Sequence, residues 1–182
     1  MLARRIVLAA LTALALAACE RHDAGASATN ATGATPPGQP ASAYHPTAEV
    51  QAFLTRNGQT AGVVTLPSGL QYQIVHSGPA SGLRPQGADE VKINYEGSLT
   101  TGQVFDSSFE RGRPEAMPLV GLVPGFSQAL MLMRPGDEWR VWIPPQLGYG
   151  GQGAGPIPPG SVLVFRIQLL DVLPDPSRIG RG

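Results

Sequence analysis

The sequence predicts an α+β domain in which an antiparallel β-sheet of about five strands wraps around one short α-helix. Composition supports this, because 23 glycines and 18 prolines among 182 residues exclude a helical bundle or a coiled coil. Apolar and polar side chains alternate along several segments, which is typical of strands with one buried face. Residues 126–133 contain neither Gly nor Pro and end before Pro135-Gly136, so they suit one short helix.

Five segments are expected to form the strands of this sheet. They are residues 70–75, 91–96, 104–105, 139–143 and 163–169. In the last of them, apolar side chains occupy every second position from Leu163 to Leu169. Trp139 and Trp142 are assigned to the core or the surface of the sheet.

An apolar stretch near the start of the sequence has the features of a secretory signal. Arg4 and Arg5 precede residues 6–18, which carry no charge. These 13 residues are too few to cross a bilayer, which needs about 20 in a helix, but they fit the apolar region of a signal peptide. Residues 1–18 are therefore expected to be a signal peptide.

The residues that end this stretch, Leu16-Ala17-Ala18-Cys19, resemble the lipobox of bacterial lipoproteins. The resemblance implies that Cys19, the single cysteine, is lipidated and anchors the chain to a bacterial membrane, since more than one acyl chain anchors a protein durably. Glu20 after the cysteine favours the outer membrane, with the domain in the periplasm. The alternative is an ordinary signal peptide that ends by chance at a cysteine.

Composition divides the remaining chain into four parts. Residues 19–46 are rich in Ala, Thr, Gly, Ser and Pro and predict a lipid-anchored flexible linker, because they cannot bury enough apolar surface to fold. Residues 47–65 predict a short helical lead-in that is N-capped by Thr47. The main domain is expected at residues 66–174, followed by a C-terminal tail at residues 175–182.

The sequence lacks conventional catalytic and binding machinery. The 13 basic and 13 acidic residues cancel and Lys92 is the only lysine, which excludes a nucleic-acid partner. His22, His45 and His76 do not have metal-ligand spacing. The glycines of residues 150–155 lead into prolines where a phosphate-binding helix would have to begin. We therefore expect neither a metal nor another cofactor.

One reaction requires neither a nucleophile nor a metal. Rotation about an Xaa-Pro bond faces a barrier of about 18–20 kcal/mol, because resonance holds the amide planar. Water stabilises the charge-separated planar form, so an apolar slot that excludes water and holds a twisted amide lowers the barrier. Such a site contains aromatic side chains and a few polar anchors.

Five stretches resemble the FKBP-type peptidyl-prolyl cis-trans isomerases, in the order and spacing of that family. They are residues 91–97 (VKINYEG), 102–108 (GQVFDSS), 122–126 (LVPGF), 147–150 (LGYG) and 157–165 (IPPGSVLVF). Residues 62–72 resemble the bacterial macrophage-infectivity-potentiator (Mip) branch, which often carries a long helical dimerisation arm. Only residues 47–57 suit helix before the domain, so we expect a monomer without that arm.

The resemblance implies a proline-binding pocket with two groups of site residues. The catalytic group is Asp106, Tyr149, Tyr95 and Phe165. The substrate-binding group is Phe105, Arg111, Leu122, Val123, Phe126 and Ile157. Aromatic rings would form the walls and Phe126 the floor, while Asp106, paired with Arg111, would polarise the substrate amide. The Val123 N–H and the Tyr149 hydroxyl would bind substrate carbonyls.

The partners implied are proline-containing polypeptides, chiefly exported proteins, and macrolide inhibitors. Three departures from the family keep alternatives open: Phe126 replaces the usual tryptophan, Glu115 stands where some members have an aromatic residue, and Pro156 stands where glycine is common. One alternative is a non-catalytic periplasmic chaperone or docking module with the same pocket, and another is a lipoprotein that binds a small hydrophobic ligand. Asp106 could also be a turn carboxylate satisfied by backbone N–H groups and Arg111, and the aromatic residues could be core packing.

Overall fold

The computed structural model describes residues 44–179. The predicted signal peptide, the predicted lipidation site Cys19 and most of the predicted linker lie outside these residues. The elements, in chain order, are α1 (Ala48–Gly58), β1 (Val63–Thr65), β2 (Gln71–His76), β3 (Glu90–Leu99), β4 (Val104–Ser107), β5 (Glu115–Pro118), α2 (Pro124–Leu132), β6 (Glu138–Ile143), the 3-10 helix η1 (Pro145–Leu147), β7 (Leu163–Leu173) and α3 (Pro176–Ile179). No helix in this described part is long and apolar enough to cross a membrane.

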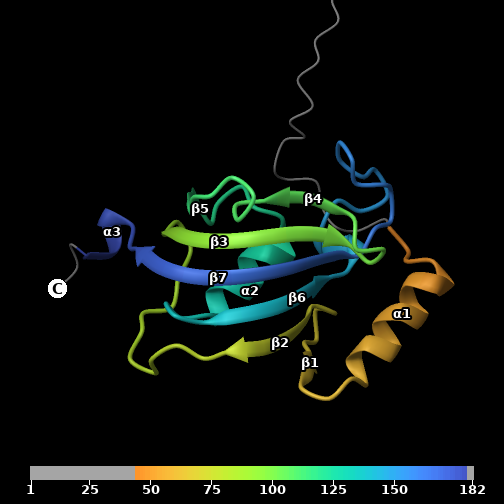
Figure 1. Cartoon of the computed structure of the whole chain (residues 1–182), viewed down its shortest axis with the longest axis horizontal. Helices are drawn as coiled ribbons and strands as arrows, with labels where there is room; N and C mark the ends of the chain where they lie inside the picture. Colours follow the sequence, from red (N-terminus) through yellow and green to blue (C-terminus); the bar gives the residue numbers. More distant parts are fainter. Residues whose placement is uncertain (1–43, 180–182) are drawn as a thin grey trace, which may run out of the picture. The chain divides into compact units, whose positions relative to one another are not determined.

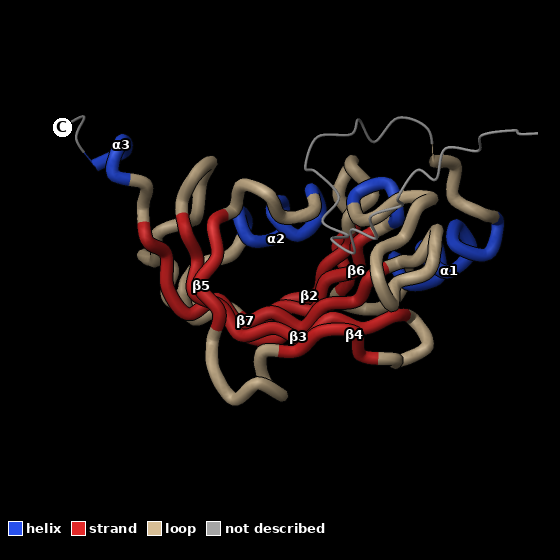
Figure 2. The backbone as a smooth tube through the Cα atoms, turned by 90° about the horizontal axis from the view of Figure 1, so that it is seen from above, coloured by secondary structure: helices blue, strands red, loops and turns tan. Residues whose placement is uncertain are grey.

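The seven described strands form one antiparallel sheet in the order β1-β2-β6-β7-β3-β4, and β5 also pairs with β3. The sheet curves, and α2 covers one of its faces (Figures 1 and 2). The predicted α+β architecture is therefore confirmed. The sequence analysis missed β1 and β5, which are three and four residues long and too short for alternation to be recognised.

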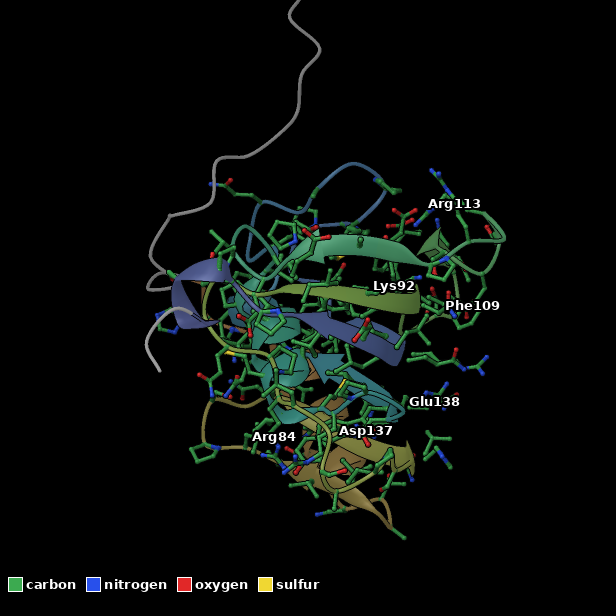
Figure 3. The ribbon with its side chains drawn as sticks, turned by 90° about the vertical axis from the view of Figure 1, so that its left-hand side faces the viewer. Arg84, Lys92, Phe109, Arg113, Asp137 and Glu138 are labelled. Atoms are coloured by element: carbon green, nitrogen blue, oxygen red, sulfur yellow. The ribbon has the colours of Figure 1, made fainter. Side chains whose placement is uncertain are left out.

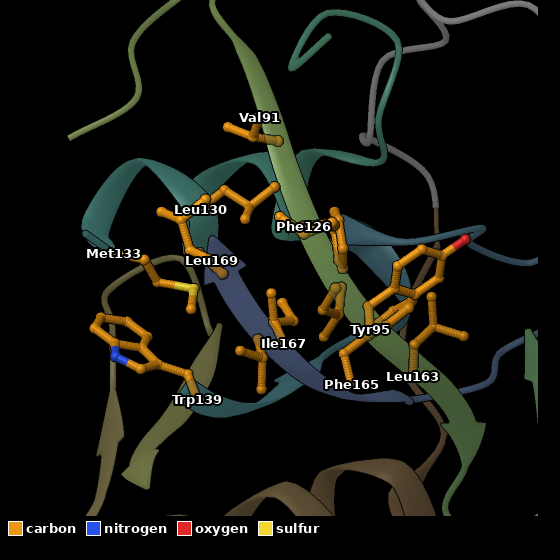
Figure 4. Close-up of a cluster of buried hydrophobic side chains, with 14 of the residues drawn as sticks. Val91, Tyr95, Phe126, Leu130, Met133, Trp139, Leu163, Phe165, Ile167 and Leu169 are labelled. Carbon is orange, nitrogen blue, oxygen red and sulfur yellow. The ribbon is translucent and has the colours of Figure 1, made fainter. Parts of the chain in front are cut away.

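The hydrophobic core lies between α2 and the covered face of the sheet (Figure 4). The apolar face predicted for β7 is confirmed, because Leu163, Ile167 and Leu169 are fully buried. They pack with Leu130 and Met133 at the α2 side and with Val91 and Ile93 of β3, among other residues. Trp139 joins this core and stacks on Tyr72, with ring centroids 4.4 Å apart.

A second apolar cluster joins α1 to the other face of the sheet. Val50, Phe53 and Leu54 of α1, with Val63, pack against Trp142, Val162 and Val164, and the last three are buried. The predicted cap is present, since the Thr47 side chain accepts a hydrogen bond from Val50 N (3.3 Å). Gln71 of β2 fastens the other end of α1 by donating to Leu54 O (2.7 Å) and accepting from Asn57 (2.8 Å).

Polar side chains occupy part of the face of the sheet away from α2, beyond the apolar cluster that α1 covers. Figure 3 shows Lys92, Phe109 and Glu138 along this face. Glu138 accepts from Arg166 Nε (2.7 Å) and Gln168 Nε2 (3.0 Å), and the Arg166 guanidinium lies 5.0 Å from the centre of the Phe109 ring. The alternation along β3 and β7 thus separates a polar outer face from the core.

Candidate functional site

Four aromatic side chains from four different elements meet at one end of the hydrophobic core. Phe165 of β7 lies at their centre, with its ring centroid 4.7 Å from Phe126, 5.7 Å from Phe105 and 6.4 Å from Tyr95. Most of these contacts are edge-on or tilted, the geometry that aromatic pairs prefer. Tyr95, Phe126 and Phe165 are buried (Figure 4), whereas Phe105 is partly exposed. The cluster thus reaches the surface at Phe105.

Gly97 makes room for these rings. In the sheet it pairs with Phe165 on β7 and with Asp106 on β4. A Cβ atom at position 97 would lie 2.6 Å from the Phe105 ring and 2.7 Å from the Phe165 ring, closer than real Cβ atoms approach other atoms. The two rings therefore occupy the space that a side chain would fill. The sequence analysis assigned no role to Gly97, although it lies in the stretch 91–97.

A hydrogen-bonded network lies beside the aromatic cluster. The Tyr95 hydroxyl donates to Asp106 Oδ2 (2.5 Å), and Arg111 Nη1 forms an ion pair with Asp106 Oδ1. Arg111 Nη2 also donates to the Tyr95 hydroxyl (3.1 Å), and its Nε donates to Glu115 (3.0 Å). The Arg111 guanidinium is thus held from three sides, and Asp106 is held by two partners.

The network keeps Asp106 ionised and Tyr95 protonated. Burial alone would raise the pKa of Asp106, but the hydrogen bonds from Tyr95 and Arg111 and the charge of Arg111 outweigh it and lower that pKa. Burial and the bond to Asp106 raise the pKa of Tyr95 to about 12. The bonds to Asp106 and Tyr95 also raise the pKa of Arg111. At neutral pH the site therefore presents a fixed carboxylate and a neutral phenol.

The start of α2 contributes the second side of the site. Pro124 at the first turn suits helix initiation because it has no N–H to leave unpaired. Val123 precedes it as the N-cap residue, and no acceptor for its N–H is found within residues 44–179. Leu122 and Val123 are partly buried against the core. This arrangement leaves one backbone donor at the positive end of a helix, next to apolar side chains.

The loop between β6 and β7 contributes the third side. Tyr149 is 39% exposed, and burial of the rest of its ring, together with the charge of Asp106, raises the pKa of its hydroxyl. Ile157 is buried against the core cluster, and its backbone N–H and C=O both pair with Ala154. The loop therefore places an exposed phenol and a buried aliphatic side chain near the aromatic rings.

The structure describes all ten residues that the sequence analysis proposed for the site. Tyr95, Phe105, Phe126 and Phe165 form the ring cluster, and Asp106 and Arg111 form the network with Tyr95. The other four, Leu122, Val123, Tyr149 and Ile157, come from the α2 start and the β6–β7 loop. Glu115 was noted only as a departure from the family, yet it binds Arg111. The spacing of four residues between Arg111 and Glu115 was its only signal in the sequence.

Such a site suits the binding of a neutral, partly apolar group. Buried rings exclude water from one side, which strengthens each hydrogen bond made there. Asp106 supplies a fixed negative charge, and the Val123 N–H and the partly exposed Tyr149 hydroxyl are hydrogen-bond donors. No cluster of three His, Cys, Asp or Glu side chains suited to a metal ion occurs among residues 44–179.

Comparisons with known families identify two matches in the chain. The family model described as "FKBP-type peptidyl-prolyl cis-trans isomerase" matches residues 82–170. The model described as "Domain amino terminal to FKBP-type peptidyl-prolyl isomerase" matches residues 24–74, of which residues 24–43 lie outside the described part. The first match contains every proposed pocket residue.

Individual proteins are similar over the same region. The chain is 47% identical over 123 residues to the peptidyl-prolyl cis-trans isomerase Mip of Coxiella burnetii, covering 67% of this chain and 53% of that protein. It is 41% identical over 126 residues to the outer membrane protein MIP of Legionella longbeachae, covering 69% and 53%. A crystal structure of a peptidyl-prolyl cis-trans isomerase from Pseudomonas syringae matches with a TM-score of 0.64 at 31% identity, covering 69% of this chain and 92% of that one. The chain thus spans about half the length of the two Mip proteins.

Proposed function

Because this chain belongs to the FKBP-type peptidyl-prolyl cis-trans isomerases, we propose that it accelerates Xaa-Pro isomerisation in proline-containing polypeptides, chiefly exported proteins. One observation carries the proposal: the Tyr95–Asp106–Arg111 network lies beside an aromatic cluster that reaches the surface at Phe105. An uncatalysed Xaa-Pro bond takes tens to hundreds of seconds to isomerise, so a site that only binds and desolvates the amide can accelerate it usefully.

The aromatic cluster acts on the proline ring. Phe105 and Phe165 contact its sides, Phe126 forms the floor, and Leu122 and Ile157 close the apolar rim. Water stabilises the planar, charge-separated amide more than the twisted one, so its exclusion lowers the barrier to rotation. These side chains supply no proton and form no bond with the substrate.

The polar groups act on the amide and its neighbours. The ionised Asp106 polarises the twisted amide, and Tyr95 and Arg111 hold this carboxylate in one orientation, so it needs no reorganisation during the reaction. The Val123 N–H and the Tyr149 hydroxyl donate to carbonyls on either side of the proline. The substrate backbone is thereby held while the Xaa-Pro bond turns.

The test is a protease-coupled prolyl isomerisation assay on the full chain, run beside an aggregation assay. Asp106→Ala and Tyr149→Phe should retain the fold by circular dichroism and lose part of the rate. Lys92→Ala, on the outer face, is the matched control and should match the unmodified chain. A folded, unmodified chain that leaves the uncatalysed rate unchanged rejects the isomerase proposal. Suppressed aggregation without rate acceleration would instead support the chaperone or docking alternative.

We also propose that Cys19 is lipidated and that the protein is held at the outer membrane with its domain in the periplasm. The lipobox-like residues support this, and so does the similarity to the outer membrane protein MIP of Legionella longbeachae. Labelling of cells with a radioactive fatty acid should mark the unmodified chain and not a Cys19→Ser variant. Label that persists in the variant, or a variant that stays in the membrane fraction, contradicts the proposal.

We further propose that the pocket binds macrolide inhibitors. We also propose that the protein is a monomer, since α1 has only 11 residues. Titration with a macrolide should quench isomerase activity, and light scattering of the full chain should give the mass of one copy. Activity that a macrolide leaves unchanged, or the mass of a dimer, contradicts the respective part.

A further inference from the structure

The loop that carries Tyr149 and Ile157 is closed at a narrow neck. Gly160 N donates to Gly150 O (2.8 Å), which brings the two ends of the loop together. Gly150 N is held in turn by Pro145 O (2.8 Å) of η1. Between these ends the backbone bonds join Ala154 to Ile157. The position of the whole loop therefore depends on what holds its neck.

Tyr44 covers this neck from outside the loop. A Cβ atom at Gly151 would lie 2.9 Å from Cδ2 of the Tyr44 ring, and a Cβ atom at Gly160 would overlap the Tyr44 hydroxyl. The Tyr44 ring thus fills the space that Gly151 at the start of the loop and Gly160 at its end leave free. In Figure 1 the chain just before α1 (orange) runs up to the loop (blue).

Tyr44 lies just before α1, and α1 itself packs beside the loop. Tyr44 lies three residues before the cap residue Thr47, and α1 packs through Val50 and Phe53 onto Val162, which follows Gly160 by two residues. Between α1 and the loop lies a groove of about 280 Å³ whose lining includes Val50, Phe53, Pro158 and Gly160. Beside this groove, Tyr44 itself lies against Gly151 and Gly160 and so links the segment before α1 directly to the neck.

We propose that Tyr44 is a positioning residue for substrate binding, which holds the neck of the 150–160 loop so that Tyr149 and Ile157 stay at the pocket. The inference rests on the proposed isomerase function for its kinetic part only. It also means that the end of the predicted linker, residues 44–46, is coupled to the substrate pocket through one aromatic side chain.

The test uses the full chain, its variants Tyr44→Ala and Tyr44→Phe, and His45→Ala as the control at the exposed neighbouring position. Hydrogen exchange of the Gly160, Ala154 and Ile157 amides should accelerate at least about tenfold in Tyr44→Ala, while the β3 amides keep their rates. KM for a proline peptide should rise about three- to tenfold with kcat within about twofold, because the loop binds substrate in ground and transition states alike. Tyr44→Phe keeps the ring on Gly151 and should behave like the unmodified chain.

A second variant approaches the same contact from the loop. Gly151→Ala places a methyl group against the Tyr44 ring and should also accelerate loop exchange. Combined with Tyr44→Ala it should add nothing, because both changes break one contact. Unchanged loop exchange in Tyr44→Ala overturns the proposal, and so does faster exchange with an unchanged KM. An unmodified chain without isomerase activity rejects the proposed function instead, and hydrogen exchange still decides whether Tyr44 holds the loop.

Discussion

The substitution Gly97→Ala tests whether the lack of a side chain at this glycine of β3 sets the positions of the pocket rings. The new methyl group would lie 2.6–2.7 Å from the Phe105 and Phe165 rings, so these rings must retreat by about 1 Å to restore ordinary contact. Overpacking of this kind costs about 1–3 kcal/mol of stability. Replacing Gly by Ala also restricts the unfolded chain, which stabilises a protein by about 0.4–1 kcal/mol when the backbone accepts alanine. We therefore expect a net loss of about 1–2 kcal/mol.

Urea unfolding followed by fluorescence measures this change in the free energy of unfolding, and the isomerisation assay measures the pocket. A displacement of about 1 Å in two pocket walls should lower kcat/KM by about tenfold or more. Glu96→Ala, next to Gly97 but on the outer face of β3, is the control and should change stability by about 0.5 kcal/mol or less. The sign decides the matter: if Gly97→Ala stabilises the protein, the rings move freely and the argument from close approach is wrong.

Further measurements test the network, the ionisation states and the core. Tyr95→Phe removes the hydroxyl that bonds to both Asp106 and Arg111, and it should lower the free energy of unfolding by about 1–2 kcal/mol. It should also shift the acid limb of the pH–rate profile to higher pH, whereas the control Tyr72→Phe should leave that limb in place. The kcat/KM of the unmodified chain should be constant from about pH 5 to about pH 9, because the pKa of Asp106 is lowered from 3.8 and that of Tyr95 is raised to about 12. For the same reason the stability that Asp106 contributes is present above pH 3.8 and is lost as the pH falls through its lowered pKa, while the stability that Tyr95 contributes is lost only as the pH rises from 10.0 through about 12. The urea concentration at the unfolding midpoint, measured across pH, checks both limits, and a midpoint that falls between pH 5 and 9 contradicts these assignments. Leu130→Ala should lower the free energy of unfolding, measured in urea, by about 2–5 kcal/mol, because the Leu130 side chain is fully buried. Met131→Ala, at a position that is 40% exposed, should lower it by about 0.5 kcal/mol or less, and equal losses would refute the assignment of the core face of α2.

Strong periodicity and end signals made much of the fold predictable. The alternation from Leu163 to Leu169, the helix that ends before Pro135-Gly136 and the Thr47 cap are all present in the structure. The segment 70–75 was less informative, because Ile74 is 48% exposed and Val75 is 59% exposed. β1 pairs only with Gln71–Gln73, and the pairing of β2 with β6 is irregular between Ile74 and His76. Alternation in sequence cannot show where the partner strand ends.

The site, too, was predictable only in part from the sequence. The residue types that fill the pocket could be matched to a family motif, but the motif does not contain the contacts that depend on strand register. Gly97 matters because β3 pairs it with Phe165 and Asp106, and that register is a property of three strands together. Tyr44 lies outside the short stretches whose residues resemble the family motif, although inside the broader match over residues 24–74, and its ring lies against Gly151 and Gly160, more than a hundred positions away in sequence. Contacts of this kind follow from tertiary packing and leave no local pattern.

The sharing of rings between core and pocket has a consequence for protein engineering. Tyr95, Phe126 and Phe165 belong to the buried cluster that stabilises the domain, so smaller side chains that widen the pocket also leave a cavity in the core. A randomised library at these three positions is expected to contain many chains that do not fold. A library at exposed positions of the 150–160 loop, such as Gln152, leaves the core intact. New ligand selectivity is therefore best sought by redesigning the loop rather than the rings.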